Sequence, residues 1–171
     1  MPPRKYRLYF LLFCGTMLYF LANVQRVAIP GTVFNLLQER LQVSAPWITG
    51  LGSAFMYVYA LNQLAVGLLV ERYGGARVIV FGAAAFCAGS QLFPLSGSLP
   101  MLYFSRALTG LGASTLYLSL VQETIRMFRN GYAVLLSIII MIGYAGGIAA
   151  NAPFALGVER FGFDAVLYAA G

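Results

Sequence analysis

Histidine is absent from this sequence, and cysteine is nearly absent. The lack of histidine removes the commonest general base and the commonest nitrogen ligand of metal ions. Cys14 and Cys87 both lie inside apolar runs, where they are predicted to be small packed side chains and not partners in a disulfide framework. With no histidine pair, metal-ligand set or nucleophile beside a base, the sequence predicts no enzyme, no metal site and no cofactor.

Charged residues are also scarce. Only 9% of the 171 residues are charged and 60% are hydrophobic, whereas about 25% of an ordinary soluble domain is charged. The net charge of +6 does not indicate nucleic acid, because the basic residues lie in turns between apolar runs and not on a soluble face. The composition therefore predicts an integral membrane protein in contact with the lipid bilayer.

Long apolar runs recur along the chain. A hydrocarbon core about 30 Å thick needs about 20 helical residues, and backbone groups in lipid must pair within the span, which forces helices. The predicted spans are residues 8–38, 46–70, 76–95, 99–122 and 131–156, with 164–171 as the start of a sixth. No linker divides the chain, so residues 1–171 are expected to form one all-α transmembrane bundle with a truncated sixth helix.

The first run follows a basic start, as a signal peptide does, but it lacks a clear small-residue cleavage site and is followed by further spans. Apolar residues at positions 33, 36, 37, 41 and 43 continue at roughly helical spacing, so this helix is expected to pass Pro30 and project beyond the membrane. Because the sixth run stops at Gly171, the chain is expected to be the front piece of a longer protein.

The distribution of basic residues predicts the orientation. With the N-terminus in the cytoplasm, the cytoplasmic side carries Arg4, Lys5, Arg7, Arg72, Arg77, Arg126 and Arg129, against Arg40 and Arg160 outside. This excess in short loops follows the positive-inside rule. We expect a multi-pass protein of the cytoplasmic (inner) membrane with a cytoplasmic N-terminus.

The turn between the second and third predicted spans carries the strongest motif, GLLVERYGGAR at residues 67–77. It resembles the signature loop of the major facilitator superfamily, with Glu71 in place of the usual aspartate and the basic cluster reduced to Arg77. The resemblance implies a latch that stabilises the outward-open state, formed by Gly67, Glu71, Arg72, Gly74 and Arg77. The alternative is a solvated turn whose arginines only fix the topology.

A second match lies in the fourth predicted span, where Arg106 precedes Gly110 and Gly112, as an arginine precedes a glycine pair in the family. Together the two matches imply the N-terminal six-helix half of a twelve-helix transporter, built from two inverted three-helix repeats. Arg106 is left with two roles: it either snorkels to the surface as an anchor or takes part in coupling and gating. The glycines predict close helix packing, or contacts that also let helices slide.

Arg26 follows the first apolar run. An arginine at a helix centre costs about 2.5–3.5 kcal/mol on insertion scales, so it normally faces a cavity or a partner; a helix that ends at Pro30 would instead put Arg26 at the lipid–water boundary. Tyr19, Arg26 and Pro30 are similar to a pattern in the organophosphate:phosphate antiporter and organic-anion branches of the superfamily. This resemblance implies that Arg26 binds a phosphate or carboxylate. If the helix continues through Pro30, Pro30 and Gly31 are expected to be a hinge and not its end.

Other polar residues are candidates to line the same site: Asn23, Tyr57, Asn62, Gln63, Tyr117, Tyr144 and Asn151. Each has an alternative role as an interhelical hydrogen-bonding residue. The sequence holds five acids, Glu39, Glu71, Glu123, Glu159 and Asp164. None falls in a predicted membrane interior, so this stretch offers no carboxylate to carry a proton.

The expected function is secondary active transport by alternating access, with a small organic or phosphorylated anion as the solute and a C-terminal half of the same transporter as the partner. Two alternatives stay open. One is a membrane sensor or receptor that uses the same fold without transport. The other is an exporter of hydrophobic compounds, although the glycine-proline pattern of such branches is only partly reproduced by Gly143, Gly146, Gly147 and Pro153.

Overall fold

The computed structural model describes residues 3–29, 31–32, 34–128, 130–162 and 165–166, and this part of the chain is helical throughout except for short turns. The helices are α1 (Pro3–Ala28), α2 (Phe34–Leu41), α3 (Ala45–Tyr73), α4 (Gly75–Leu95), α5 (Leu99–Met127), α6 (Tyr132–Ala149) and α7 (Ala152–Phe161). The predicted all-α fold is confirmed for the described residues. Of the predicted sixth span, only residues 165–166 are described; the rest, with Asp164, lies outside the described residues.

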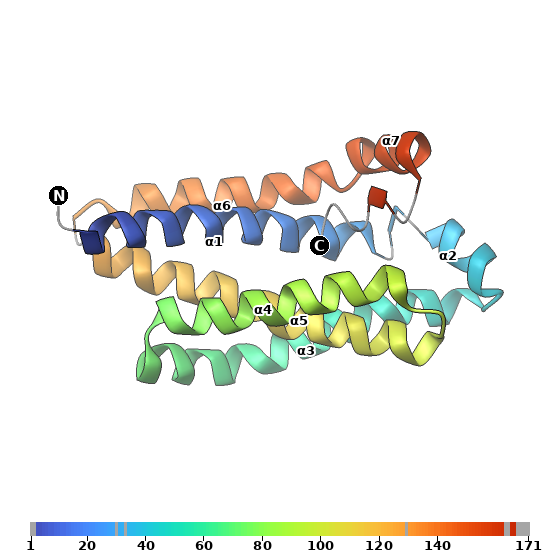
Figure 1. The fold of residues 1–171 in the computed structure, drawn as a ribbon, viewed down its shortest axis with the longest axis horizontal. Helices are drawn as coiled ribbons and strands as arrows, with labels where there is room; N and C mark the ends of the chain where they lie inside the picture. The colour runs from blue at the N-terminus through green and yellow to red at the C-terminus, as the bar shows by residue number, and fades with distance from the viewer. Residues whose placement is uncertain (1–2, 30, 33, 129, 163–164, 167–171) are drawn as a thin grey trace.

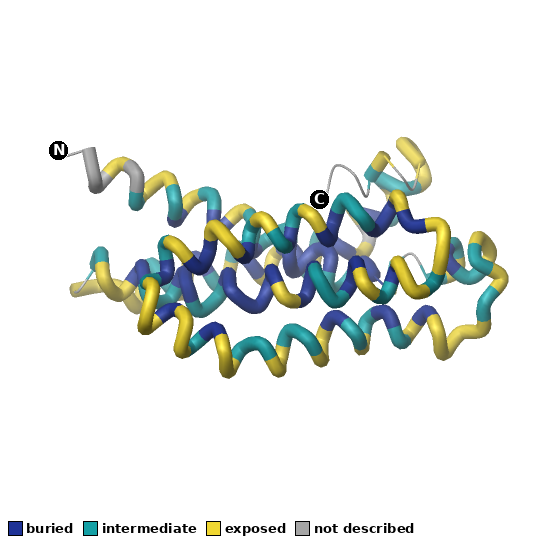
Figure 2. Tube along the Cα trace, turned by 60° about the horizontal axis from the view of Figure 1, so that its bottom comes forward, coloured by how far each residue is buried: buried dark blue, intermediate teal, exposed yellow. Residues whose placement is uncertain are grey.

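The long helices run roughly parallel to one axis and form one bundle (Figure 1). Helix α5 lies at its centre and packs against α4, α3 and α1, while α6 packs chiefly against α1. Buried residues gather along the faces that these helices turn toward one another, and exposed residues cover the outside (Figure 2). Two apolar clusters form the interior, one around Ile29, Ile48 and Phe93 and the other around Phe55, Phe86 and Leu116.

Four described helices are long and apolar enough to cross a membrane: residues Leu8–Ala28 of α1, and the whole of α3, α4 and α6. Helix α5 is as long as α3, but it carries many polar residues. Most of them are buried against other helices, among them Ser105, Thr109, Ser114 and Ser119. Because its neighbours shield α5 from lipid, a polar α5 is compatible with a bundle that spans the bilayer.

The first predicted span, 8–38, is wrong as a continuous helix. Helix α1 ends at Ala28, and the chain turns before α2 starts at Phe34, whose N–H donates to the carbonyl of Gly31 at 3.3 Å. The physical reason is in the sequence: a proline at position 30 has no N–H to donate and disfavours helical geometry in the preceding residue. Pro30 itself, the predicted hinge, lies outside the described residues.

The fifth predicted span, 131–156, is also divided. Helix α6 ends at Ala149, and α7 starts at Ala152 with a proline in its first turn. The hydroxyl of Thr32, in the turn after α1, donates to the carbonyl oxygen of Ala150 at 2.7 Å. The turn after α1 therefore lies against the break between α6 and α7. Thr32 supplies a hydrogen bond to the carbonyl of Ala150 at the end of α6, where the helix no longer provides one.

Candidate substrate cavity

A cavity of about 240 Å³ lies between α1, α3, α5 and α6. Its lining is mostly aromatic and polar, consisting of Tyr19, Ala22, Asn23, Arg26, Phe55, Tyr59, Gln63, Ala113, Tyr117 and Tyr144. Arg26 is the charged member of this set. The cavity reaches the surface of the bundle at Tyr144, a lining residue that is 54% exposed.

Helix α1 supplies the polar wall. Tyr19, Asn23 and Arg26 follow one another at spacings of four and three residues, which places them on one face of a helix. Asn23 is buried, and its Nδ2 donates to the carbonyl oxygen of Tyr19 at 2.9 Å, so its side chain lies along the helix. Arg26 is half-buried. The helix ends two residues after Arg26, yet the side chain lines a cavity and does not lie at an exposed helix end.

Arg26 is the strongest electrostatic feature of the cavity. Its guanidinium has no hydrogen-bond or ionic partner among the residues that the structure describes, and the lining contains no carboxylate. A guanidinium stays protonated at any physiological pH and presents donors in a planar fork. A partly desolvated cation without a partner favours the entry of an anion.

Aromatic rings form the remaining walls. The ring centroids of Tyr19 and Tyr117 lie 6.0 Å apart at an interplanar angle of 35°, so these rings contact each other, and those of Phe55 and Tyr59 stack at 6.0 Å and 17°. Tyr59 was missed by the sequence-based prediction. It lies four residues before Gln63 on the same helix face, and this spacing is a signal that could have found it.

The structure brings six of the predicted binding residues to the cavity: Tyr19, Asn23, Arg26, Gln63, Tyr117 and Tyr144. The other three lie elsewhere. Tyr57 is 71% exposed and is not part of the cavity lining. Asn62 donates to Ser114 Oγ on α5 at 2.7 Å, which is the interhelical hydrogen bond that was the alternative. Asn151 donates to the carbonyl oxygen of Gly147 at 2.9 Å, four residues earlier in the chain, and so makes a local hydrogen bond and not an interhelical one.

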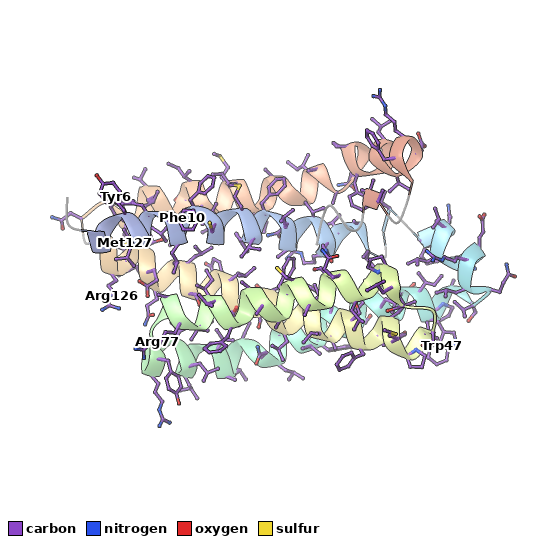
Figure 3. The ribbon with its side chains drawn as sticks, in the orientation of Figure 1. Tyr6, Phe10, Trp47, Arg77, Arg126 and Met127 are labelled. Carbon is purple, nitrogen blue, oxygen red and sulfur yellow. The ribbon has the colours of Figure 1, made fainter. Side chains whose placement is uncertain are left out.

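The predicted latch lies at the arginine-rich end of the bundle, opposite Trp47, as the positions of Arg77 and Arg126 show in Figure 3. Glu71, Arg72 and Arg77 are exposed, and Gly74 has a φ of +83°, a conformation that suits glycine, at the junction of α3 and α4.

Helix α5 holds this junction with two residues that the sequence did not single out. Gln122 Oε1 accepts from the N–H of Gly75 at 2.6 Å, while its Nε2 donates to the carbonyl of Val70 at 3.0 Å. Glu123, which is only 1% exposed, accepts from the N–H of Ala76 at 2.9 Å. Side chains of α5 therefore make hydrogen bonds to backbone groups at both the end of α3 and the start of α4.

Arg106 does not snorkel to the surface. It is 1% exposed, and its Nη2 and Nε donate to the carbonyl oxygens of Ile29 and Leu51 at 3.1 and 3.5 Å. Its guanidinium also lies 4.6 Å from the centre of the Phe55 ring, which lines the cavity. Arg106 therefore connects the end of α1 with the cavity wall on α3.

The glycines that follow Arg106 on α5 allow close packing. A methyl group on Gly110 would lie 2.6 Å from the carbonyl oxygen of Phe55, and one on Gly112 would overlap the backbone of Phe86. These contacts confirm the prediction of close helix approach at both positions.

Comparison with known proteins adds an independent line of evidence. The family model described as "Major Facilitator Superfamily" matches residues 8–171. "Probable anion transporter 4, chloroplastic" of Oryza sativa subsp. japonica is 25% identical over 99% of this chain and 28% of its own length. "Ascorbate transporter, chloroplastic" of Arabidopsis thaliana is 24% identical over 99% of this chain and 31% of its own length. No solved structure matches.

A bacterial relative is also similar: "Tetracenomycin C resistance and export protein" of Streptomyces glaucescens is 25% identical over 90% of this chain and 29% of its own length. The chain thus spans about a third of the length of these relatives. The family match covers nearly the whole chain and includes both the loop at residues 67–77 and the arginine before the glycine pair. The chain belongs to the Major Facilitator Superfamily.

Proposed function

We propose that this chain is the N-terminal half of a secondary active transporter for a small organic or phosphorylated anion. The observation that carries the proposal is Arg26, a cation without a described partner in a cavity that contains no carboxylate. A bound phosphate or carboxylate supplies the missing countercharge and accepts two parallel hydrogen bonds from the guanidinium. The rings of Tyr19 and Tyr117 form one wall beside the solute, and their hydroxyl groups are available to donate further hydrogen bonds.

The relatives support an anionic solute. Two that match nearly the whole chain carry "anion transporter" or "ascorbate transporter" in their names. Neither name assigns a substrate to this chain, but an anionic solute is what a cavity with a cation as its charged residue favours.

The mechanism is alternating access. The open side of the cavity, where Tyr144 is exposed, faces a second helical bundle, and the two bundles rock around the solute between them. The latch residues are Gly67, Glu71, Arg72, Gly74 and Arg77. They lie at the arginine-rich end of α3 and α4, with Gly67 further along α3, and stabilise one of the two states. Space around Gly67 supports this role, because nothing lies within 4 Å of a methyl group placed there and another helix has room to approach.

The arginine-rich end lies in the cytoplasm, and the membrane is the cytoplasmic (inner) membrane of the cell. Arg72, Arg77 and Arg126 are exposed at this end, in agreement with the positive-inside rule. A single cysteine placed at Asn130, in the turn between α5 and α6, tests the orientation. We expect a membrane-impermeant maleimide to label it only after the membrane is opened; labelling of intact cells contradicts the orientation.

A second candidate is an exporter of hydrophobic compounds, which the similarity to the Streptomyces export protein and the aromatic cavity walls favour. Counterflow in vesicles that contain the full-length protein separates the candidates. Preloaded inorganic phosphate or carboxylates should accelerate the entry of the same labelled anion, and neutral aromatic compounds should not. Acceleration by neutral aromatics alone supports the exporter, whereas binding of an anion without any flux supports a sensor.

A further inference from the structure

A second hollow lies on the outside of the bundle, between α3 and α4 with α5 as its floor. Its volume is about 490 Å³, and its lining is Asn62, Val66, Leu69, Tyr73, Arg77, Val78, Phe81, Gly82, Leu111 and Thr115. We call this hollow the α3–α4 groove. It shares no lining residue with the substrate cavity, which contacts the Tyr59 and Gln63 side of α3.

The surface of the groove is apolar. Val66, Leu69 and Phe81 supply much of the wall. Apart from Tyr73 and Arg77 near the end of α3, its polar residues are satisfied by the protein, because Asn62 donates to Ser114 Oγ at 2.7 Å and Thr115 Oγ1 donates to the carbonyl of Gly112 at 2.8 Å. The groove therefore suits hydrocarbon and not a polar solute.

The length of the groove matches one leaflet of a bilayer. Its lining on α3 runs from Asn62 to Tyr73, which at 1.5 Å per residue spans about 16 Å. Half of a hydrocarbon core about 30 Å thick is nearly the same. Since Tyr73 ends α3 at the arginine-rich end, the groove extends from that membrane surface to about the bilayer centre.

Positive charge lies at the surface end of the groove and nowhere else along it. Arg77 lines this end, is exposed, and has no side-chain partner among the described residues. The guanidinium of Arg72 lies 5.4 Å from the centre of the Tyr73 ring, beside the same opening. Glu71, the nearby acid, lines a different hollow with Arg72 and Arg126 and is not part of the groove.

We propose that the α3–α4 groove binds one anionic phospholipid of the leaflet at the arginine-rich end. One acyl chain lies along Val66, Leu69 and Phe81, and Arg77 binds the headgroup phosphate. The arrangement combines an apolar channel one leaflet long with a cation at the level of the headgroups, and basic pockets between membrane helices bind anionic headgroups in this way. The proposal does not depend on the transported solute.

The test is native mass spectrometry of the full-length protein, with phosphatidylglycerol or phosphatidylcholine of identical acyl chains as the added lipid. Arg77→Gln removes the headgroup cation, and Arg126→Gln is the matched control, since Arg126 is exposed at the same end but does not line the groove. Leu69→Trp fills the groove, and Leu68→Trp, 71% exposed and outside it, is its control.

We expect the wild-type protein to retain phosphatidylglycerol in preference to phosphatidylcholine. Arg77→Gln should weaken phosphatidylglycerol binding about fivefold, the effect of one basic residue near an anionic surface. Leu69→Trp should lower binding of both lipids, and the two controls should bind as the wild type does. Equal losses for Arg77→Gln and Arg126→Gln, or wild-type binding by both Arg77→Gln and Leu69→Trp, overturn the proposal.

Discussion

The substitution Gly143→Ala should weaken solute binding although residue 143 does not line the cavity. Gly143 on α6 is buried against the ring of Tyr19 on α1, and a methyl group at this position would overlap ring atoms Cδ1 and Cε1. Separating the two helices would open the close contact one turn further along α6, where Gly146 packs so near the backbone of Phe20 that a methyl group there would overlap its carbonyl oxygen. We therefore expect the Tyr19 ring to shift, and with it the part of the cavity wall that it forms beside Tyr117.

The size of the effect follows from the cost of overpacking. Forcing an extra methyl group into a packed site costs about 1–3 kcal/mol. If the cost appears in solute binding, the affinity falls about 5- to 150-fold at 1.4 kcal/mol per factor of ten. We expect this loss in the KM for uptake by vesicles that contain the full-length protein, and in the Kd measured by calorimetry.

The helix offers a matched control. A methyl group on Gly147 meets only Val27 Cγ2 at 3.5 Å, an ordinary contact, so Gly147→Ala should leave both constants unchanged. In a double-mutant cycle, Gly143→Ala should have little further effect on Tyr19→Ala, which removes the ring. Equal losses for both glycine variants, or full additivity of Gly143→Ala with Tyr19→Ala, would refute the steric argument.

Three further predictions concern other residues. Asn62→Leu should lower the stability of the purified protein by about 0.6 kcal/mol, which is typical of an interhelical hydrogen bond in a membrane. The KM for uptake should not change, and a raised KM would indicate that Asn62 contacts the solute. Gln122→Ala should destabilise the protein by about 1–3 kcal/mol, because it leaves the N–H of Gly75 unpaired; an unchanged midpoint in thermal unfolding would contradict this role. Tyr57→Ala should leave uptake unchanged, since the side chain is 71% exposed and does not line the cavity. A loss of uptake would show that the binding site extends beyond the cavity.

The long apolar runs were sufficient to predict the all-α bundle, because length and hydropathy directly reflect the thickness of the bilayer. The prediction failed where helices break. The apolar pattern continues past Pro30 and past Asn151. Hydropathy takes no account of the backbone geometry that a proline imposes, so it did not predict that the helices break there. Helix α5 shows the converse: its hydropathy is low because its neighbours, and not lipid, surround its polar side chains.

The cavity was predictable in part. Tyr19, Asn23 and Arg26 share a face of one helix, so their spacing alone places them together. Tyr59, which lines the cavity, was missed, and Tyr57, which was predicted, does not line it, because which face of α3 turns inward depends on packing against α5. Asn62 was assigned to the cavity, but its partner is Ser114 on α5, and a contact between residues so distant in sequence leaves no local signal.

The most direct test of the account is the uptake of labelled anions by vesicles that contain the full-length protein with Arg26→Ala or Arg26→Lys. A hydrogen bond to a charged group contributes about 1.5–3 kcal/mol, so Arg26→Ala should lower the affinity for the transported anion at least about tenfold. Arg26→Lys, which keeps the charge but loses the planar fork, should have an intermediate effect. Unchanged affinity of Arg26→Ala for every transported anion would contradict the assignment of Arg26 as the anion-binding residue.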